Sequence, residues 1–564
     1  MSHGRAASVL AAITLVATLG LAPAARGAES NSRTWCGTDR DSARASIWAH
    51  REQVSRHPRP VQVQAREDVE IGDITVLMDG GDLALLQNRF DLHSVGLVFE
   101  PAGDGFRASR VDSAVAPDAG TILQLGDDDT REVALPFSFS FYGTTYQAVF
   151  VNSDGNLTFT RGDIASTSRS LGRMAAGPPR IAPLFADFDP SVGGSVRTLS
   201  EDARFTVTWT GVPRYGERDS NTFRVTLRAD GGFELAYAQA LAESVEAVTG
   251  VAPGEGRGEL VGVDFSETGA ASGILLAESF REQDQLDSIA TARRFYAGRN
   301  DDYDQLVVFT TQTLTEPRTI AYQQTVQNQI SGIGDGSYDY SAEHGSAGRL
   351  ESFVMMDDLA KYPADPHAIA FSPDSTLSIL AHETGHRWLA QVLFRSAERN
   401  SDALLGRADV HWSFFMNSLG SYLEGNEIED VGAGRFQTIA ASTRYSPLDQ
   451  YLMGIRSPGE VPDFFYVDEI SGTPLTDEDQ NPRAGVTFSG VRHDVSVDDV
   501  IAAEGARNPA PQPPASPWRQ AFILVSIGGP PATHDVDQVE RILRAWPAFF
   551  ARSTSDRWSV ETKR

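Results

Sequence analysis

The sequence predicts a multidomain protein with a β-rich N-terminal leader, a β-sandwich and a C-terminal α+β domain. Its 564 residues suggest three or four domains, since domains commonly hold about 100–200 residues. Apolar side chains alternate with period two through the middle of the chain, whereas strand-like and helix-like patterns are mixed nearer the C-terminus. We therefore expect a leader at residues 29–117, the sandwich at 118–275 and the α+β domain at 290–564.

Residues 1–28 have the pattern of a secretory signal peptide. The positively charged "MSHGR" precedes the apolar run "AASVLAAITLVATLGLA", and "APA" supplies small residues for cleavage. Later apolar runs are too short to span a bilayer. The sequence thus predicts a secreted, extracellular protein without a membrane anchor.

The net charge and the cysteine content limit which partners the protein can bind and what can stabilise its fold. The formal net charge is −28, and such an acidic surface repels phosphate backbones, so we expect no nucleic-acid partner. The single cysteine, Cys36, excludes an intramolecular disulfide. Packed cores or a metal must supply the stability instead.

The predicted sandwich begins near Gly120, where aromatic and small residues alternate in "EVALPFSFSFYGTTYQAVFVNSDGNLTFT". Turns are expected at Tyr142-Gly143 and at Ser153–Asn156. The segments "PFSFSFYG", "VFVNSDGNLTF" and "PRIAPLFADFDP" resemble NIDO-like extracellular β-domains. The resemblance implies an accessory or adhesion module. Asp187 and Asp189 are either ordinary loop acids or ligands of a possible Ca²⁺ ion.

The α+β region contains one helix with a chemical motif, "SPDSTLSILAHETGHRWLAQVLF". Ser372 is the expected N-cap and Pro373 the first helical residue, with the helix running past Leu393. Before it we expect a strand in "YDQLVVFTTQ", a helix in "AYQQTVQNQISGIG" and a strand in "RLESFVMMDDL". A last amphipathic helix is expected in "DVDQVERILRAWPAFFARS".

His382 and His386 lie one helical turn apart, so both imidazoles can bind one metal ion. Glu383 lies just off that face, where it can reach a metal-bound water without ligating the ion. A bound Zn²⁺ lowers the pKa of its water to about 7, which makes a nucleophile available at neutral pH. "HETGH" resembles the active-site helix of zincin metallopeptidases. The resemblance implies that His382 and His386 bind zinc and that Glu383 is the catalytic base for peptide-bond hydrolysis.

A third zinc ligand is required, and the metzincin continuation H-E-x-x-H-x-x-G-x-x-H is absent here. Three residues downstream are candidates: His411, Glu424 and Asp449. We favour His411, because neutral imidazole is the commonest zinc ligand. The pair His411-Trp412 resembles the third-histidine context of leishmanolysin-type peptidases, and Met453 in "YLMG" is a candidate methionine turn.

Three other residues have candidate roles at this site. Tyr445 or Tyr451 could stabilise an oxyanion. Cys36, near the mature N-terminus, could occupy the open metal position as a cysteine switch, because zinc deprotonates a coordinating thiol. An intermolecular disulfide and an incidental thiol are the alternatives.

The sequence thus predicts a secreted zinc-dependent endopeptidase that acts on proteins or peptides. One alternative is a non-catalytic secreted adhesion or binding protein with a relic zincin domain. An intact Glu383 counts against that alternative. The other is a metallohydrolase that acts on a bond other than a peptide bond.

Overall fold

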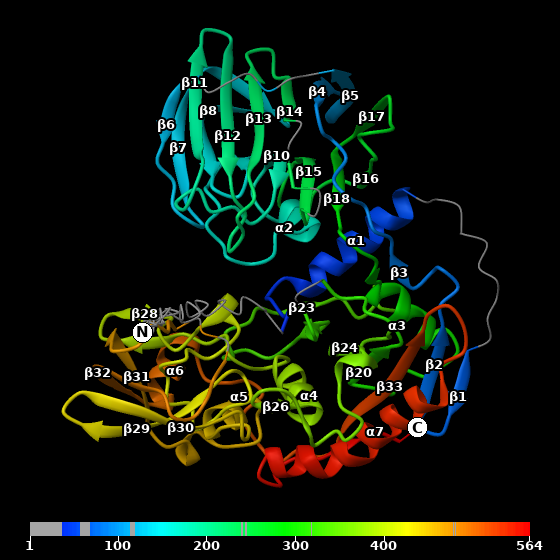
Figure 1. Ribbon diagram of the computed structural model, residues 1–564, viewed down its shortest axis with the longest axis vertical. Helices are drawn as coiled ribbons and strands as arrows, with labels where there is room; N and C mark the ends of the chain where they lie inside the picture. Colours follow the sequence, from blue (N-terminus) through cyan, green and yellow to red (C-terminus); the bar gives the residue numbers. More distant parts are fainter. Residues whose placement is uncertain are drawn as a thin grey trace, which may run out of the picture. The chain divides into compact units, whose positions relative to one another are not determined.

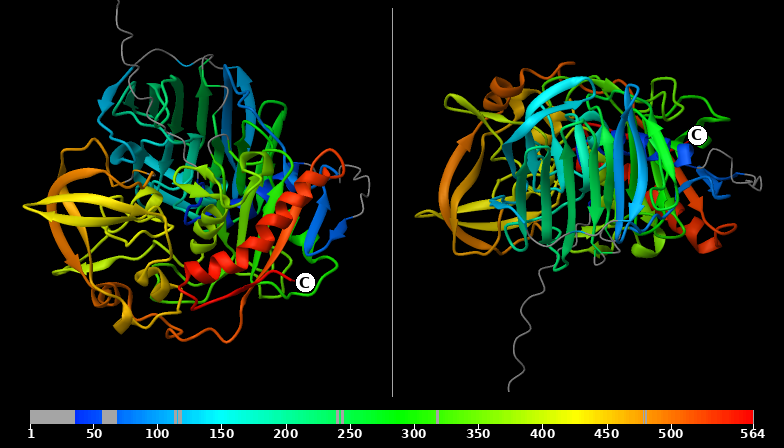
Figure 2. Two further views of the ribbon diagram at one scale, coloured as in Figure 1. Left: turned by 60° about the horizontal axis from the view of Figure 1, so that its bottom comes forward. Right: turned by 90° about the horizontal axis from the view of Figure 1, so that it is seen from above.

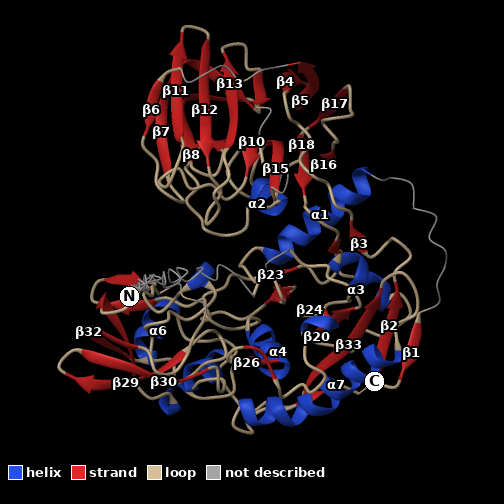
Figure 3. Ribbon diagram, in the orientation of Figure 1, coloured by secondary structure: helices blue, strands red, loops and turns tan. Residues whose placement is uncertain are grey.

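Strands outnumber helices in the computed structural model (Figure 3). It describes residues 36–56, 68–112, 115, 119–238, 241–242, 245–316, 319–477, 479 and 481–563. The predicted signal peptide at residues 1–28 lies outside these residues. Thr34–Arg564 form one compact unit.

The helices are short apart from the first and the last. They are α1 (Ser42–Arg56), α2 (Leu171–Ala176), α3 (Ser288–Tyr296), α4 (Thr376–Gly385), α5 (Pro447–Leu452), α6 (Val497–Glu504) and α7 (Thr533–Ser553), with 3₁₀ turns at Leu359–Lys361, Arg407–Asp409 and Pro458–Glu460. In the described part of the chain, no helix is long and apolar enough to cross a membrane.

A mixed sheet lies at the centre of the α+β region (Figure 1). Its order is β1 (Val69–Ile71), β2 (Ile74–Met78), β33 (Trp518–Ser526), β20 (Gln305–Thr310), β24 (Ser352–Asp358) and β21 (Tyr322–Thr325), with β34 (Val560–Glu561) pairing β33. Strands β2, β33, β20 and β24 run parallel, whereas β1 and β21 are antiparallel to their neighbours. Strand β21 is an edge strand, because it stands at the end of this order.

Both faces of this sheet are buried, as expected for parallel strands. In β20, Val307 and Phe309 join one apolar cluster, to which α4 and α7 contribute, while Leu306 and Val308 join another, to which α3 contributes. Figure 2 shows α7, the red helix, against the sheet, where it contacts β33 and β2. Helix α4 lies beside α7 and contacts β24 and β21 of the same sheet.

The predicted β-sandwich consists of two sheets that share one apolar core. The first has the order β16 (Leu260–Gly262), β18 (Leu275–Phe280), β15 (Ala247–Ala252), β10 (Arg180–Phe185), β9 (Asn156–Thr158), β8 (Thr144–Asn152) and β7 (Thr130–Phe141). The second has the order β17 (Ala270–Gly273), β5 (Gly105–Asp112), β4 (Val95–Ala102), β14 (Phe233–Tyr237), β13 (Asn221–Arg228), β12 (Arg204–Val212), β11 (Ser195–Glu201) and β6 (Thr121–Leu123).

The predicted sandwich turns are confirmed. Tyr142 and Gly143 join β7 to β8 with φ of 47° and 76°, and residues 153–155 join β8 to β9. The sandwich starts earlier than residue 118, however. Strands β4 and β5 pair with each other and with β14 and β17, so its first strand begins at Val95.

The remaining strands form one four-stranded sheet and four small pairs. The sheet has the order β29 (Asn426–Gly432), β30 (Arg435–Ala441), β32 (Thr487–Val495) and β31 (Phe464–Ser471). The pairs are β3 (Ala84–Leu85) with β19 (Gln285–Leu286), β22 (Gln327–Asn328) with β23 (Tyr338–Asp339), β25 (Ile369–Phe371) with β26 (Asp374–Ser375), and β27 (Phe394–Ser396) with β28 (Arg399–Ser401).

The described residues of the expected leader, 29–117, do not form a separate module. Strands β1 and β2 extend the central sheet, β4 and β5 belong to the sandwich, and β3 pairs with β19. The reason is burial. Every residue of "ITVLM" in β2 is buried, so this strand needs cover on both faces. It finds that cover beside β33 in the central sheet, where Ile74 and Val76 join one apolar cluster and Leu77 joins the other.

Two helix predictions are wrong in detail. Helix α4 begins after the N-cap Ser375, not Ser372, and ends at Gly385 with His386 as its C-cap, well before Leu393. The hairpin β25–β26 takes up the residues before the cap, and Ala390 has a φ of 61°, which no helix continues through. "AYQQTVQNQISGIG" forms β21 and β22 instead of a helix, because β21 pairs with β24. The strands β20 and β24 and the last helix, α7, are confirmed.

We expect Ile74→Ala to lower the free energy of unfolding by about 2–4 kcal/mol, because it removes a buried side chain from the central sheet. Ile74 is 2 % exposed, whereas Ile71 in β1 is 40 % exposed. Ile71→Ala is therefore the matched control, with an expected loss below about 1 kcal/mol. Urea denaturation of the full chain measures both. Equal losses would contradict the assignment of β2 to the core.

Candidate metal centre

Helix α4 positions the first two imidazoles. Ser375 and Ser378 form a reciprocal capping box at its N-terminus, which fixes where the helix starts. Every residue of the helix is buried. His382 and His386 therefore occupy fixed positions one turn apart, and Glu383 lies between them in the chain.

A tight loop brings the third imidazole to the helix. His411 closes the loop through its carbonyl, which accepts from Gly406 N–H at 2.9 Å. Its ring Nδ1 donates to the Arg407 carbonyl at 2.8 Å. The ring centroids of His411 and His386 lie 4.8 Å apart. The loop thus orients His411 Nε2 toward the rings on α4.

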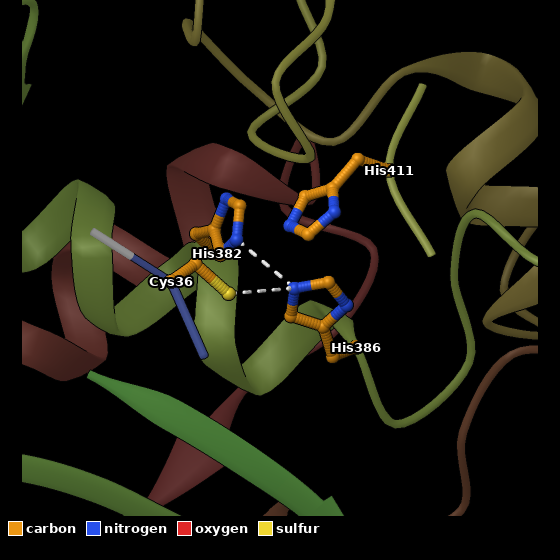
Figure 4. A group of neighbouring side chains, drawn as sticks. All are labelled: Cys36, His382, His386 and His411. Atoms are coloured by element: carbon orange, nitrogen blue, oxygen red, sulfur yellow. Dashed lines mark hydrogen bonds between the residues drawn. The ribbon is translucent and has the colours of Figure 1, made fainter. Parts of the chain in front are cut away.

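The N-terminal segment supplies a fourth donor, Cys36. Gly37 N–H donates to the carbonyl of Ala321 at 2.9 Å, and Cys36 forms a parallel bridge with Ala321. Cys36 Sγ lies 3.4 Å from His386 Nε2. Figure 4 shows the sulfur and the three rings facing one another, and one ligand atom from each lies within 4.8 Å of the others.

This donor set fits a zinc ion. Tetrahedral zinc, with Zn–N of about 2.0–2.1 Å and Zn–S of about 2.3 Å, separates its ligand atoms by about 3.3–3.6 Å. The Nε2 atoms of His382 and His386 lie 3.0 Å apart, and Cys36 Sγ lies 3.4 Å from the latter. These two distances are close to that separation, and all four ligand atoms lie within 4.8 Å of one another, so the group could hold one ion.

Hydrogen bonds and burial also favour neutral, ligand-competent imidazoles. His382 Nδ1 donates to the Tyr422 carbonyl at 2.6 Å, as His411 Nδ1 does to Arg407. Each bond holds the proton on Nδ1 and leaves Nε2 as an acceptor. Burial lowers the pKa of His382 to about 3 and the pKa values of His386 and His411 well below the usual range.

Glu383 lies beside the donors. Its Oε2 accepts from Thr38 Oγ1 at 3.0 Å and contacts the Cys36 thiol at 3.7 Å. Its Oε1 is buried and has no hydrogen-bond partner among the described residues. Burial raises the pKa of this carboxyl to about 8, with small opposing contributions from Thr38 and Cys36.

Arg407 is a cation at the site that the sequence did not indicate. Its Nη2 donates to Glu424 Oε1 at 2.7 Å and lies 2.9 Å from His411 Nε2. Its Nη1 donates to the Cys36 carbonyl at 3.0 Å. In the sequence, only the four-residue spacing between Arg407 and His411 could have pointed to this contact. The two residues lie in a loop that contains a 3₁₀ turn and not in an α-helix.

The structure separates the three candidates for third ligand. His411 joins the group of four donors. Glu424 Oε1 lies 3.6 Å from His411 Nε2, but it pairs with Arg407. Asp449 is a cap residue: its Oδ2 accepts from Ser446 N–H at 2.7 Å, and its Oδ1 accepts from Trp412 Nε1 at 2.9 Å.

The tyrosines proposed for the oxyanion role bond to the main chain instead. Tyr445 donates to the Ala381 carbonyl at 2.5 Å. Its ring packs closely against Gly385, so that a Cβ at this glycine would lie only 3.0 Å from a ring carbon. Tyr451 accepts from Arg507 N–H at 3.2 Å. Met453 ends α5 and packs in the same apolar cluster as α4, which is compatible with a methionine turn.

The proposed calcium ligands have other partners. Asp187 pairs with Arg169 at 2.9 Å, and Asp189 accepts from Ser191 N–H at 2.9 Å. Within the described ranges, the cluster of Cys36, His382, His386 and His411 is the one group of three or more His, Cys, Asp or Glu close enough to hold a metal ion. We therefore do not propose a calcium site.

A cavity of about 360 Å³ adjoins the N-terminal segment where it leaves the cluster. Gly37 and Asp39 line it from that segment, Tyr322 and Gln324 from the edge strand β21, and Phe280 from the sandwich. The cavity thus reaches the edge strand, and its lining includes none of the four metal donors.

Comparisons with known proteins bear on the sandwich alone. The family model described as NIDO related matches residues 107–291, a span that contains most of the sandwich strands. No curated protein and no solved structure matches the chain. The resemblance expected for the β-domain is confirmed, and its start at residue 107 agrees with strands that begin before residue 118.

We expect Tyr445→Phe to destabilise the protein without changing how much metal it binds. The substitution removes a buried hydroxyl and leaves the Ala381 carbonyl without that donor, at a cost of about 1–3 kcal/mol. Thermal or urea unfolding gives the stability, and elemental analysis gives the metal content. A stable variant that loses metal would mean that Tyr445 acts on the ligand set directly.

Proposed function

We propose that the protein is a secreted zinc-dependent endopeptidase whose ion is held by His382, His386 and His411. One observation carries the proposal: three imidazoles and a thiol converge within 4.8 Å in a buried site, beside the carboxyl of Glu383. Such a set matches the three protein ligands and one exchangeable position of catalytic zinc.

Charge balance supports a divalent ion. Burial raises the pKa values of Cys36, Glu383 and Glu424, which reflects the cost of burying negative charge there. If all three ionise, they carry −3, and Arg407 carries +1, so the sum is −2. A Zn²⁺ ion would bring the site to neutrality and restore the ionised forms.

Unsatisfied polar atoms support the same proposal. Glu383 Oε1, His386 Nδ1 and Arg407 Nε are buried without a partner among the described residues. Buried polar groups usually have a partner, and exceptions often mark catalytic groups or places for water and ions. Three such atoms in one site suggest that it takes a ligand.

Zinc, when bound, would supply an acidic water and polarise a substrate carbonyl. Glu383 would take the proton from the attacking water and return it to the leaving amine. Its Oε1 has no partner in the described structure, and Oε2 is released when Thr38 leaves with the N-terminal segment.

The contacts of the N-terminal segment favour a peptide as the substrate. This segment lies against the edge strand β21. Gly37 N–H donates to the main-chain carbonyl of Ala321, just before the strand, and Gln323 N–H in the strand donates to the Thr38 hydroxyl. Peptides commonly bind to exposed sheet edges in this way. A metallohydrolase for another kind of bond would have less use for such an edge.

Cys36 would hold the enzyme in a closed form. Its sulfur takes the fourth donor position, which the catalytic water would need. A zinc-bound thiolate is a strong ligand. Activity would therefore require Cys36 to leave, by cleavage or displacement of the N-terminal segment.

The second candidate function is adhesion. The NIDO-related match over residues 107–291 favours an extracellular binding module, and in that case the metal cluster would have a structural role. Zinc content alone does not separate the two functions, whereas cleavage of casein with and without a chelator does.

We expect one zinc per purified chain, and His411→Ala to lose most of it because zinc loses one of its ligands. Asp449→Asn and the exposed control His367→Ala should keep their zinc. Elemental analysis of folded variants, checked by circular dichroism, measures this. If His411→Ala kept one zinc per chain and Glu424→Gln lost its zinc, the third ligand would be Glu424 and not His411.

We expect Glu383→Gln to keep its zinc and lose casein cleavage by at least about 100-fold, as for a missing general base. The comparison is made in the Cys36→Ser chain, where a thiolate no longer holds the N-terminal segment at the metal. Full activity of the Glu383→Gln variant would contradict the assigned base. Zinc without any cleavage in the Cys36→Ser chain would favour the adhesion function.

We expect Cys36→Ser to raise protease activity about tenfold or more over the wild-type chain, because a hydroxyl is a much weaker zinc ligand than a thiolate. Assays of the two uncleaved proteins at equal zinc content measure the difference. Equal activity would show that the thiol does not close the site.

A further inference from the structure

The N-terminal segment shows how a peptide is held at the candidate centre. Its Cys36 side chain lies among the imidazoles, and its main chain bonds to Ala321 beside the edge strand. The carbonyl of Cys36 accepts from Arg407 Nη1 at 3.0 Å. That carbonyl belongs to the residue whose side chain lies among the metal donors, so its partner is the group that a substrate carbonyl in the same place would meet.

Arg407 is held in place by its surroundings. Glu424, which is 2 % exposed, accepts from Nη2 at 2.7 Å. The main chain of Arg407 is fixed by the loop that His411 closes, since the Arg407 carbonyl accepts from His411 Nδ1 at 2.8 Å. One contact competes with metal binding, that of Nη2 with His411 Nε2. The contacts with Glu424 and with the carbonyl can persist beside a bound ion.

The two tyrosine hydroxyls considered for an oxyanion are held elsewhere. Tyr445 donates to the Ala381 carbonyl, and the Tyr451 hydroxyl lies at Arg507 N–H, from which it accepts. Thr38 bonds to Glu383 and leaves with the N-terminal segment. Arg407, in contrast, keeps a buried Nε–H without a partner in the described structure and frees Nη1 when the segment leaves.

We infer that Arg407 is a catalytic residue that donates to the carbonyl oxygen of the bound peptide, with Glu424 as its positioning residue. This inference rests on the proposed function. When water adds to the carbonyl carbon, the C=O π electrons move onto the oxygen, and Arg407 stabilises the charge that develops there. The C–N bond then breaks, and the amine leaves with the proton that Glu383 carries.

The test compares Arg407→Gln and Arg407→Lys in the Cys36→Ser chain, with Arg544→Gln as the control. Arg544 is exposed on α7 and pairs with Glu540, so its loss removes the same charge far from the centre. Three quantities are measured: zinc per chain, kcat and KM for a casein-derived peptide, and the calorimetric affinity for its phosphinic analogue, which mimics the tetrahedral state.

We expect Arg407→Gln to keep one zinc and a KM within about threefold, while kcat falls about 100-fold or more, as when one oxyanion donor is removed. The affinity for the phosphinic analogue should fall by a similar factor. Arg407→Lys keeps the charge but not the forked guanidinium, so its kcat and its phosphinic affinity should lie between those of Arg407→Gln and the parent chain. If Arg407→Gln does not fold, Arg407→Lys alone is compared with the parent chain. Arg544→Gln should match the parent chain.

Two results would overturn the inference and leave the proposed function intact. Unchanged kcat and phosphinic affinity with full zinc would mean that Arg407 does not contact the reacting carbonyl. Loss of zinc in both Arg407 variants would mean that Arg407 only supports His411. A parent chain without zinc or cleavage would overturn the proposed function, and this inference with it, before any variant is compared.

Discussion

A buried group of three imidazoles and one thiol is the constraint around which the rest of the candidate site is arranged. They are buried almost completely, and burial drives each ring to its neutral form. Main-chain carbonyls hold the Nδ1 protons of His382 and His411, so their Nε2 atoms face the cluster as acceptors. A group of acceptors this close repels itself unless a cation or a proton lies between them. The capped helix, the tight loop before His411 and the docked N-terminal segment all maintain this arrangement.

Local patterns in the sequence were sufficient to predict part of the site and part of the sandwich. In the site, the spacing of His382 and His386 specifies one helix face. In the sandwich, turn residues such as Tyr142-Gly143 specify hairpins. The preference for His411 rested on ligand chemistry, and the fold brings that residue to the helix. The ends of α4 were misjudged, because Ser372, Pro373 and Asp374 carry helix-start chemistry but belong to a hairpin that tertiary packing forms.

Long-range pairing determines what the sequence could not predict. Nothing in "ITVLM" distinguishes a strand of a leader from a strand that pairs with residues more than four hundred positions away. Likewise, Arg407 and Thr38 carry no motif. The loop that His411 closes brings Arg407 to the site, and Thr38 joins it when the N-terminal segment docks beside β21. Propensity also misassigned β21, whose glutamines are common in helices but here fill an edge strand.

The distance along the chain between the donors has a consequence for how the protein folds. His382, His386 and His411 lie within thirty residues, whereas Cys36 is 350 residues from His386. Closing a long loop has a larger entropic cost than closing a short one, and contacts of high sequence separation slow folding. The imidazoles can therefore gather, and take up an ion, while the sulfur is still remote. The contact of Cys36 with His386, which closes the centre, would therefore form last. The order in which the centre assembles thus follows from the order of its residues in the chain.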